Sequence, residues 1–261
     1  MASFADLLLF ELDTSHQAVV EIPSDWMQGR TAFGGLLAAM ATRAMGQRIP
    51  AGRDLLGLDV AFIAPAGPGP VTIEVQSLRE GRFVSQASAE IRFEGSTATR
   101  VHGIFGTRRD SRLVVPAAPA VPSKPRDRGL RLPFLPGITP EFTQHFEFHF
   151  TEGGLPFSGA SEPVIGGFFR HLTEASGMEA VVALVDAWPA PLLPVASGPV
   201  PASSIHWSTH IVSPPPQDFD GYWWHRAHVV QANGGYGSIV ARLYADKTLI
   251  AWSEQLVAVY G

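Results

Sequence analysis

The chain has 261 residues, of which 46% are hydrophobic and 16% charged, so it can bury a sizeable core in one large domain or two of ordinary size. Its formal net charge of −5 gives no basic stripe and argues against nucleic acid as a partner. The sequence contains no cysteine, which excludes disulfides, thiolate metal sites and a cysteine nucleophile and leads us to expect a cytoplasmic protein.

No membrane partner is predicted. The sequence has no run of about 18 apolar residues, which a membrane-spanning helix would need. The first residues, MASFADLLLFELD, lack a basic region and carry acids among the leucines, so they are not typical of a signal peptide.

The first half predicts an antiparallel sheet built on one buried helix. Residues 17–22 (QAVVEI) alternate as a strand should. Within GRTAFGGLLAAMATRAM, the residues Leu36, Leu37 and Met40 recur at helical spacing, and alanines make most of the remaining surface small. A helix that is apolar on nearly every side is a buried one. Further strands are predicted at 55–64, 71–78, 82–94 and 98–106.

Gly34 and Gly35 stand where this helix begins. The first N–H groups of a helix have no partner within it, and the helix dipole makes that end positive. Without a Cβ in the way, such an end can hold a carbonyl oxygen or an oxyanion. The alternative is structural, because two glycines also let a core helix pack tightly.

The second half repeats the first beyond a proline-rich segment. Residues 114–140 show no periodicity, which is typical of a linker, so we predict domains at 1–113 and 141–261. Strands are predicted at 144–150, 205–212, 222–231, 238–244 and 249–259, with a helix that begins near Met178. The repeated order predicts an α+β fold in which one continuous sheet or two abutting sheets curve around two helices.

Several blocks of the sequence match the motifs of one family. GRTAFGGLLAAMATRA is similar to its first-helix motif, and the run from LDVAFIAPAG to VHGIFG is similar to its strands, with the turn at residues 79–82 (REGR). ALVDAW, SSIHWSTHIVSPP and DKTLIAWSEQLV are similar to its remaining blocks. Over nearly its whole length except the linker, the chain resembles the acyl-CoA thioesterase II family. The resemblance implies a double hot-dog fold, with two central helices each wrapped by a curved antiparallel β-sheet.

The resemblance also implies an activity and a set of residues. The family hydrolyses fatty acyl-CoA thioesters with an oriented water molecule and without a metal or a nucleophilic serine, so no cofactor is expected beyond the coenzyme A of the substrate. Gln255 matches the family's glutamine that orients the water. Asn233 is the residue we match to the position where the family has a hydroxyl residue. His206 occupies the position of the family's acid. Resembling proteins often associate, so we expect a homo-oligomer, at least a dimer.

Two residues are candidates for the general base. An unperturbed histidine pKa near 6.5 suits His206 to neutral pH, although His206 is equally explained as a core histidine beside Trp207. Asp186 is a lone acid in the apolar helical run VVALVDAW, where an acid needs a partner or a cleft. Its structural alternative is an acid at the end of a helix, bonded to a nearby Trp or Arg.

The remaining predicted site residues contact or orient the substrate. The residues predicted to bind substrate are Phe33, Gly34, Gly35 and Arg82. Arg82 would meet the phosphates of coenzyme A, but exposed hairpin arginines are usually solvated. Gln255 is alternatively a residue that bonds to backbone at a sheet edge. Asn233 is alternatively a turn residue, because Asn-Gly is a strong hairpin signal.

Four histidines invite a metal interpretation, namely His145, His149, His225 and His228. His225 and His228 are three residues apart, so they point to opposite faces of a strand. No acidic residue is placed with the four histidines, so no metal site is predicted. The sequence also bears on two rival functions. An enoyl-CoA hydratase needs an Asp/His pair on one turn of a central helix, which neither helix supplies. A non-catalytic acyl-CoA binding protein is favoured by His206 in place of the acid.

Overall fold

One antiparallel sheet of 12 strands forms the frame of the structure, a computed structural model that describes residues 2–117, 120–216, 219 and 221–260. A separate two-stranded hairpin and two main helices complete it. In chain order the elements are α1 (Phe4–Leu7), β1 (Gln17–Ile22), η1 (Ser24–Trp26), β2 (Met27–Gln28), β3 (Thr31–Ala32), α2 (Gly34–Gly46), β4 (Asp54–Phe62), β5 (Gly69–Glu80), β6 (Val84–Phe93), β7 (Ser96–Gly106), η2 (Arg126–Arg128), β8 (Leu130–Leu132), η3 (Glu141–His145), β9 (Phe146–Gly153), β10 (Val164–His171), α3 (Gly177–Asp186), β11 (Ala202–Ile211), β12 (Trp223–Asn233), β13 (Tyr236–Ala245) and β14 (Thr248–Val259).

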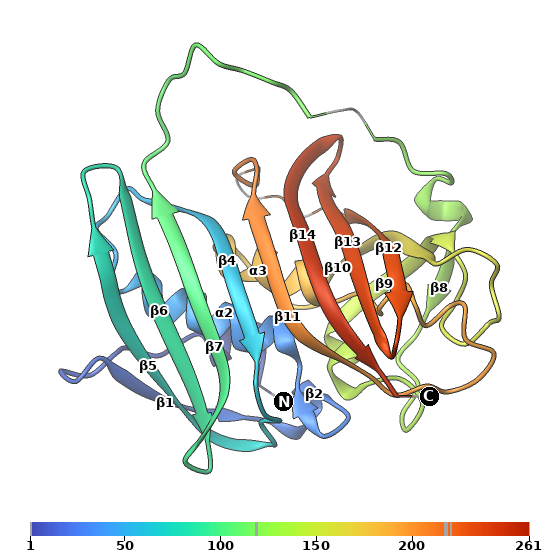
Figure 1. The fold of residues 1–261 in the computed structure, drawn as a ribbon, viewed down its shortest axis with the longest axis horizontal. Coiled ribbons are helices and arrows are strands. Elements are labelled where there is room, and N and C mark those ends of the chain that lie inside the picture. The colour runs from blue at the N-terminus through green and yellow to red at the C-terminus, as the bar shows by residue number, and fades with distance from the viewer. Residues whose placement is uncertain (1, 118–119, 217–218, 220, 261) are drawn as a thin grey trace.

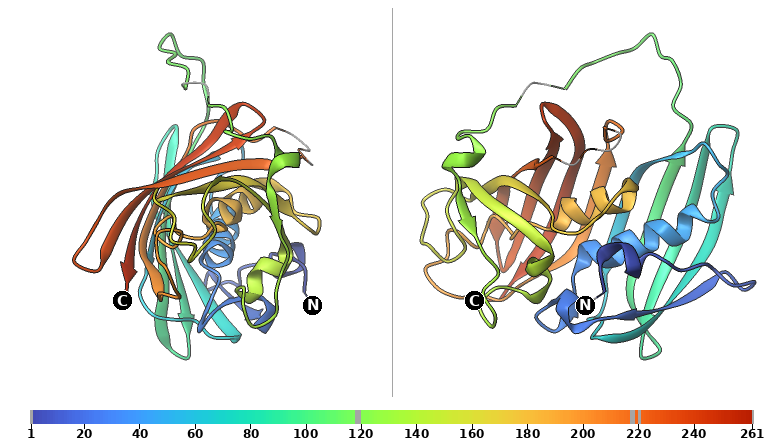
Figure 2. Two further views of the ribbon diagram at one scale, coloured as in Figure 1. Left: turned by 90° about the vertical axis from the view of Figure 1, so that its right-hand side faces the viewer. Right: turned by 180° about the vertical axis from the view of Figure 1, so that it is seen from behind.

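The sheet is continuous across both halves of the chain (Figure 1). Its strand order is β1-β5-β6-β7-β4-β11-β14-β13-β12-β10-β9-β8, and neighbouring strands are antiparallel. The halves meet where β4 pairs with β11, with Val60 opposite Trp207. Both helices lie together on the concave side of this sheet (Figure 2). The helices therefore share one sheet, which is the first of the two predicted arrangements, and are not each wrapped by a sheet of their own.

The repeat is visible in the strand order. The first half runs β1-β5-β6-β7-β4 and the second runs β10-β12-β13-β14-β11, with β9 and β8 added at the outer edge. The counterpart of β1 is therefore β10, and the predicted strand at 144–150 corresponds to the additional strand β9. Sequence analysis missed β10 because Gly166 and Gly167 interrupt its strand pattern. Those glycines are required there, since a Cβ on Gly166 would collide with the backbone oxygen of His225.

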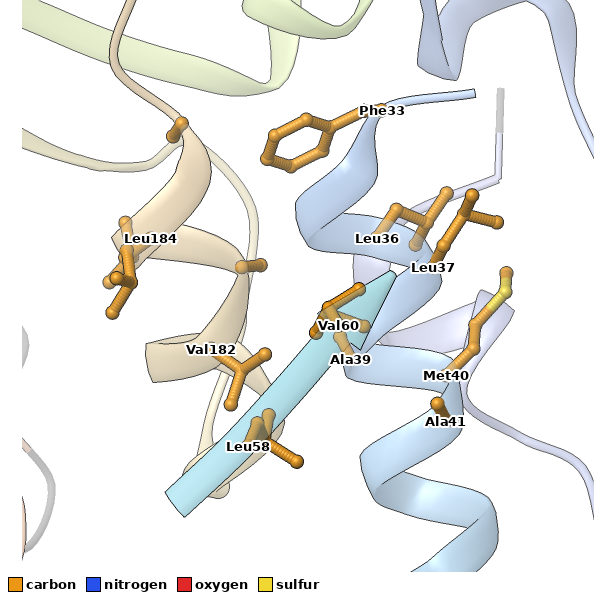
Figure 3. Close-up of a cluster of buried hydrophobic side chains, with 14 of the residues drawn as sticks. Phe33, Leu36, Leu37, Ala39, Met40, Ala41, Leu58, Val60, Val182 and Leu184 are labelled. Carbon is orange, nitrogen blue, oxygen red and sulfur yellow. The ribbon is translucent and has the colours of Figure 1, made fainter. Parts of the chain in front are cut away.

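The two helices are the centre of the core. Nearly every residue of α2 is buried, because α3 covers one side of it and the sheet covers another. Figure 3 shows Leu58 and Val60 of β4 close to Val182 of α3 and Ala39 of α2.

Both main helices are short. With 13 residues in α2 and 10 in α3, no helix in the described part of the chain is long and apolar enough to cross a membrane.

Stacked rings fasten the start of the chain to the second half. Phe33 stacks on Phe142 with ring centroids 4.2 Å apart and planes 4° from parallel. Trp26 stacks on His145 at 3.9 Å and 5°, and His145 Nε2 lies 3.1 Å from the backbone oxygen of Asp25. These contacts join η1 and the start of α2 to η3, so the entry to α2 is held from both halves.

Replacing Gly35 with alanine is predicted to destabilise the fold. The added Cβ would lie 2.8 Å from the backbone oxygen of Ala183 and against the ring of Phe33. Overpacking of this kind costs about 1–3 kcal/mol, and the free energy of unfolding from a denaturant titration measures it. Gly46→Ala is the matched control, because nothing lies within 4 Å of its added Cβ and alanine is the better helix former. Equal losses in both variants would contradict tight packing of α2 on α3.

Candidate active site

Asp186 and Gln255 form a hydrogen-bonded pair where the end of α3 meets the start of α2. Gln255 Nε2 donates to Asp186 Oδ1 over 2.7 Å. Asp186 is the last residue of α3, and Gln255 lies on the inner face of β14, opposite the fully buried Trp207 of β11. Each residue as a whole is partly buried, while burial of the Asp186 carboxyl itself is what raises its pKa.

The two glycines that begin α2 lie directly against this pair. The backbone N–H of Gly35 donates to the Asp186 carboxyl. A Cβ on Gly34 would lie 2.7 Å from Asp186 Oδ2, so any larger residue would push the carboxyl away. The start of α2 is therefore at the candidate site, as the sequence predicted, but its Gly35 amide binds a carboxyl of the protein itself.

The Asp186 carboxyl titrates near neutral pH. Burial raises its pKa to about 7, while the hydrogen bonds from the Gln255 side chain and the Gly35 backbone act in the opposite direction. A group that is divided between its charged and neutral forms at pH 7 is suited to remove and return a proton. The Gln255 amide does not titrate, so it can only hold and orient its neighbours.

Two further residues lie on the same side of the sheet as the pair. The ring of Phe62 lies against Gly34, because a Cβ there would be 2.8 Å from its Cζ. Ser204 of β11 is paired with the buried Val257, two residues beyond Gln255, and therefore faces the same inner side of the sheet. A hydroxyl, an amide and a carboxyl thus come from three separate segments.

Sequence analysis missed Ser204 and named His206 because of a β-bulge. The register of β11 shifts between Ser204 and His206, which leaves Ile205 as the extra residue. Simple alternation from Trp207 would assign Ser204 to the outer face. In the structure His206 is exposed on that outer face, between Ala61 of β4 and Leu256 of β14. The fold does not bring His206 to the Asp186–Gln255 pair.

Asn233 lies at the tip of a hairpin rather than beside the pair. It ends β12 and is exposed. Gly234 and Gly235 follow with φ values of 60° and 83°, the two positive angles of a tight hairpin turn. Its position matches the structural alternative, in which Asn-Gly makes a turn.

Phe33 and Arg82 do not join the Asp186–Gln255 pair. Phe33 is fully buried and stacked on Phe142, so it supports the start of α2 from within the core. Arg82 is exposed at the turn between β5 and β6, with its guanidinium 4.9 Å from the centre of the Phe83 ring. Of the predicted site residues, the structure brings together Asp186, Gln255, Gly34 and Gly35.

The histidines are dispersed. His149 Nε2 lies 3.1 Å from Glu147 Oε1. His225 stacks on Trp188, and His145 stacks on Trp26. Among the residues that the structure describes, no group of three or more His, Cys, Asp or Glu side chains could hold a metal ion.

Two hollows lie near Gln255 on the inner face of the second half. A small cavity of about 10 Å³ lies between the end of α3 and β12–β14, and Trp188, His225 and Gln255 are among its lining residues. A larger groove of about 450 Å³ is open and mostly apolar, with Leu192 and Val229 in its walls. Val229 shares a cross-strand row with Ile239 and Gln255, so the groove begins beside that row and runs toward the β12–β13 turn. We call these the small cavity and the apolar groove.

Models of two protein domains match the sequence and show the family of the chain. The model of the acyl-CoA thioesterase N-terminal domain matches residues 22–106, and that of the acyl-CoA thioesterase C-terminal domain matches residues 115–259. The chain belongs to the acyl-CoA thioesterase family. A search of curated proteins finds no match for this thioesterase-family chain.

Solved structures show the fold of this acyl-CoA thioesterase family member to be the hot-dog fold. A conserved protein of unknown function with a hot-dog fold from Alicyclobacillus acidocaldarius is 23% identical, with a TM-score of 0.87 over 99% of this chain and 98% of that one. A putative thioesterase II from Thermobifida fusca is 20% identical, with a TM-score of 0.83 over 100% and 98%. The acyl-CoA thioesterase II TesB2 from Mycobacterium marinum is 14% identical, with a TM-score of 0.77 over 99% of each chain.

The Asp186→Asn variant is predicted to gain stability relative to the parent as the pH rises. The pKa of Asp186 is about 7 in the folded chain, against an ordinary value of 3.8, so between about pH 4 and pH 7 the folded chain binds the proton more tightly than the unfolded chain. The parent therefore loses stability as the pH rises through that window, whereas an asparagine has no charge to form. Denaturant titrations at pH 5 and pH 8 measure the difference.

The control for this titration is Glu254→Gln, which removes an exposed acid from the same strand as Gln255. Its effect should be the same at both pH values. If the difference in free energy of unfolding between Asp186→Asn and the parent were also independent of pH, the Asp186 carboxyl would not be shielded from water as the structure indicates.

Proposed function

We propose that this protein hydrolyses an acyl-CoA thioester with a water molecule activated by Asp186 and oriented by Gln255. The observation that carries the proposal is the pair itself, a carboxyl with a pKa of about 7 that lies 2.7 Å from an amide donor on the inner face of the sheet. Membership of the acyl-CoA thioesterase family supports the substrate class.

Asp186 is the proposed general base. Its carboxylate removes a proton from water as the water oxygen attacks the carbonyl carbon of the thioester. The tetrahedral intermediate then collapses, the carbon–sulfur bond breaks, and the proton passes from Asp186 to the departing thiolate of coenzyme A. The products are a carboxylic acid and free coenzyme A, and Asp186 returns to its starting form.

The start of α2 is the proposed partner of the developing oxyanion. Because the Gly35 amide binds Asp186, we assign the neighbouring first-turn amide of Gly34 to the carbonyl oxygen. The hydroxyl of Ser204, on the inner face near Gln255, takes the role that the family resemblance gives to a hydroxyl residue. In this proposal Asn233 and His206 have no part in the chemistry.

A non-catalytic acyl-CoA binding protein would be expected if the chain had lost its catalytic acid, since His206 stands where the family has that acid. The pair of Asp186 and Gln255 supplies a titrating group next to an orienting amide without His206. The geometry therefore favours a hydrolase over a binding protein.

Replacement of Asp186 is the direct test. Asp186→Asn is expected to lower kcat/KM by about 10²–10⁴, the usual effect of removing a general base. The parent rate should rise with pH and level off above about pH 7, since only the ionised carboxyl accepts the proton. Release of the coenzyme A thiol from acyl-CoAs of graded chain length measures both.

His206→Ala, which alters an exposed residue of the outer face, is the control and should stay within about twofold of the parent. A damaging His206→Ala combined with a mild Asp186→Asn would reassign the base to His206. A parent that binds acyl-CoA without hydrolysing it would support the binding protein instead.

A further inference from the structure

Burial of the Asp186 carboxyl needs an apolar cover, because its two hydrogen-bond donors do not supply one. The Gln255 amide and the Gly35 backbone N–H both donate to it, and each favours the charged carboxylate. Burial acts in the opposite direction and outweighs both, so the pKa is raised to about 7. Apolar groups must therefore exclude water on the sides of the carboxyl that these two donors leave uncovered.

The ring of Phe62 lies on one of those sides. A Cβ placed on Gly34 would be 2.7 Å from Asp186 Oδ2, 2.8 Å from Phe62 Cζ and 3.0 Å from Phe62 Cε1. The carboxyl oxygen and the edge of the ring therefore border the same point above Gly34. A water molecule at that point would be closer to the ring than an ordinary contact of about 3.5 Å, so the ring excludes it.

Phe62 also lies at the boundary between the interior and the solvent. It is the last residue of β4 and faces inward, as Leu58 and Val60 of the same strand do. Those two residues are 2% and 0% exposed, whereas Phe62 is only partly buried and the next residue, Ile63, is 55% exposed. The ring thus has the carboxyl beyond one edge and solvent beyond another, which is the position of a cover.

Among the described residues, no charged neighbour offers another explanation for the titration of Asp186 near neutral pH. The first turn of α2 contains no charged residue, and Glu179 lies at the opposite end of α3. His225 in the small cavity is neutral, because burial lowers its pKa to about 3. The titratable residues of the strands near this point face the outer side of the sheet, namely Asp59 of β4, His206 of β11 and Glu254 of β14. Burial is therefore the cause, and the groups that provide it control the titration.

We infer that Phe62 is a positioning residue for the proposed reaction, whose ring keeps water from the Asp186 carboxyl at the start of α2. The inference rests on the proposed function, because only there is Asp186 the general base. Phe62 takes no part in the proton transfer and acts through Asp186 alone. Phe62 belongs to the first half of the chain and Asp186 to the second, so one half sets the pKa of the base that the other half supplies.

The test follows the titration of Asp186 itself and needs no substrate. Carboxyl resonances are recorded by NMR in protein that contains isotope-labelled aspartate, and the Asp186→Asn variant identifies the resonance of Asp186. In the parent the pKa should be about 7. In Phe62→Ala water reaches the carboxyl, so the pKa should fall by roughly one unit or more toward the ordinary value of 3.8.

A chemical rescue separates the loss of the cover from a general loosening of the fold. The chain contains no cysteine, so Phe62→Cys introduces a single thiol. Benzyl methanethiosulfonate then attaches an aromatic ring to that thiol, whereas methyl methanethiosulfonate attaches only a small group. The pKa of Asp186 should be low in Phe62→Cys with or without the methyl group, and the benzyl group should return it to within about half a unit of the parent.

Phe93→Ala is the matched control. Phe93 is also a partly buried aromatic residue at the end of a strand in the first half, but it ends β6, and its ring lies against Gly67. Its removal should leave the pKa of Asp186 as it is in the parent. Thermal unfolding shows whether each variant is folded, and Phe62→Cys takes the place of Phe62→Ala if the latter does not fold.

The outcomes separate this inference from the proposed function. The inference is overturned by a pKa of Asp186 near 3.8 in the parent, by an unchanged pKa in folded Phe62→Ala, by an equal fall in Phe93→Ala, or by a fall that the benzyl group does not reverse. Hydrolysis of acyl-CoAs is measured separately. If the parent cleaves none of them while the pKa falls in Phe62→Ala as expected, the proposed function fails and the cover stands. If the parent cleaves them and the pKa does not change, only the inference fails.

Discussion

The close approach of the start of α2 to the end of α3 is the contact on which both the fold and the candidate site depend. Gly34 and Gly35 lack the Cβ that would separate the helices, so the Asp186 carboxyl reaches the first amides of α2. The same crowding removes water from that carboxyl and shifts its titration to neutral pH. Tight packing and proton chemistry therefore have one cause, and a change at either glycine alters both.

The repeat of the fold is not a repeat of its chemistry. α2, the counterpart of α3, contains no acidic residue, and β7, the counterpart of β14, contains no amide side chain. The first half therefore cannot form a second pair like that of Asp186 and Gln255. It contributes Gly34, Gly35 and Phe62 to the pair of the other half, so the candidate site needs the whole chain although its titrating group comes from one half.

Local patterns in the sequence predict much of this structure, and the parts they miss have physical reasons. The strand at 17–22 and the buried helix that begins at Gly34 are found as expected, because alternation and helical spacing are local signals. β10 was missed because its two glycines serve close approaches to its neighbours, Gly166 to β12 and Gly167 to β9. Asp186 and Gln255 were named from sequence, but Ser204 was not, since a bulge at Ile205 reverses the side on which the next residues lie. The raised pKa of Asp186 comes from atoms far away in sequence.

The pairing of β4 with β11, which we call the seam, depends on the segment at 114–140 that links the two halves. A half standing alone would expose one of these strands as an open edge, and an open edge pairs readily with any similar strand. The described part of that segment before η2 arches over one end of the sheet (Figure 1), whereas β8 joins the edge of the sheet beside β9. The segment thereby keeps the edges of β4 and β11 at a high effective concentration. This tether favours closing the seam within one chain over strand exchange between chains.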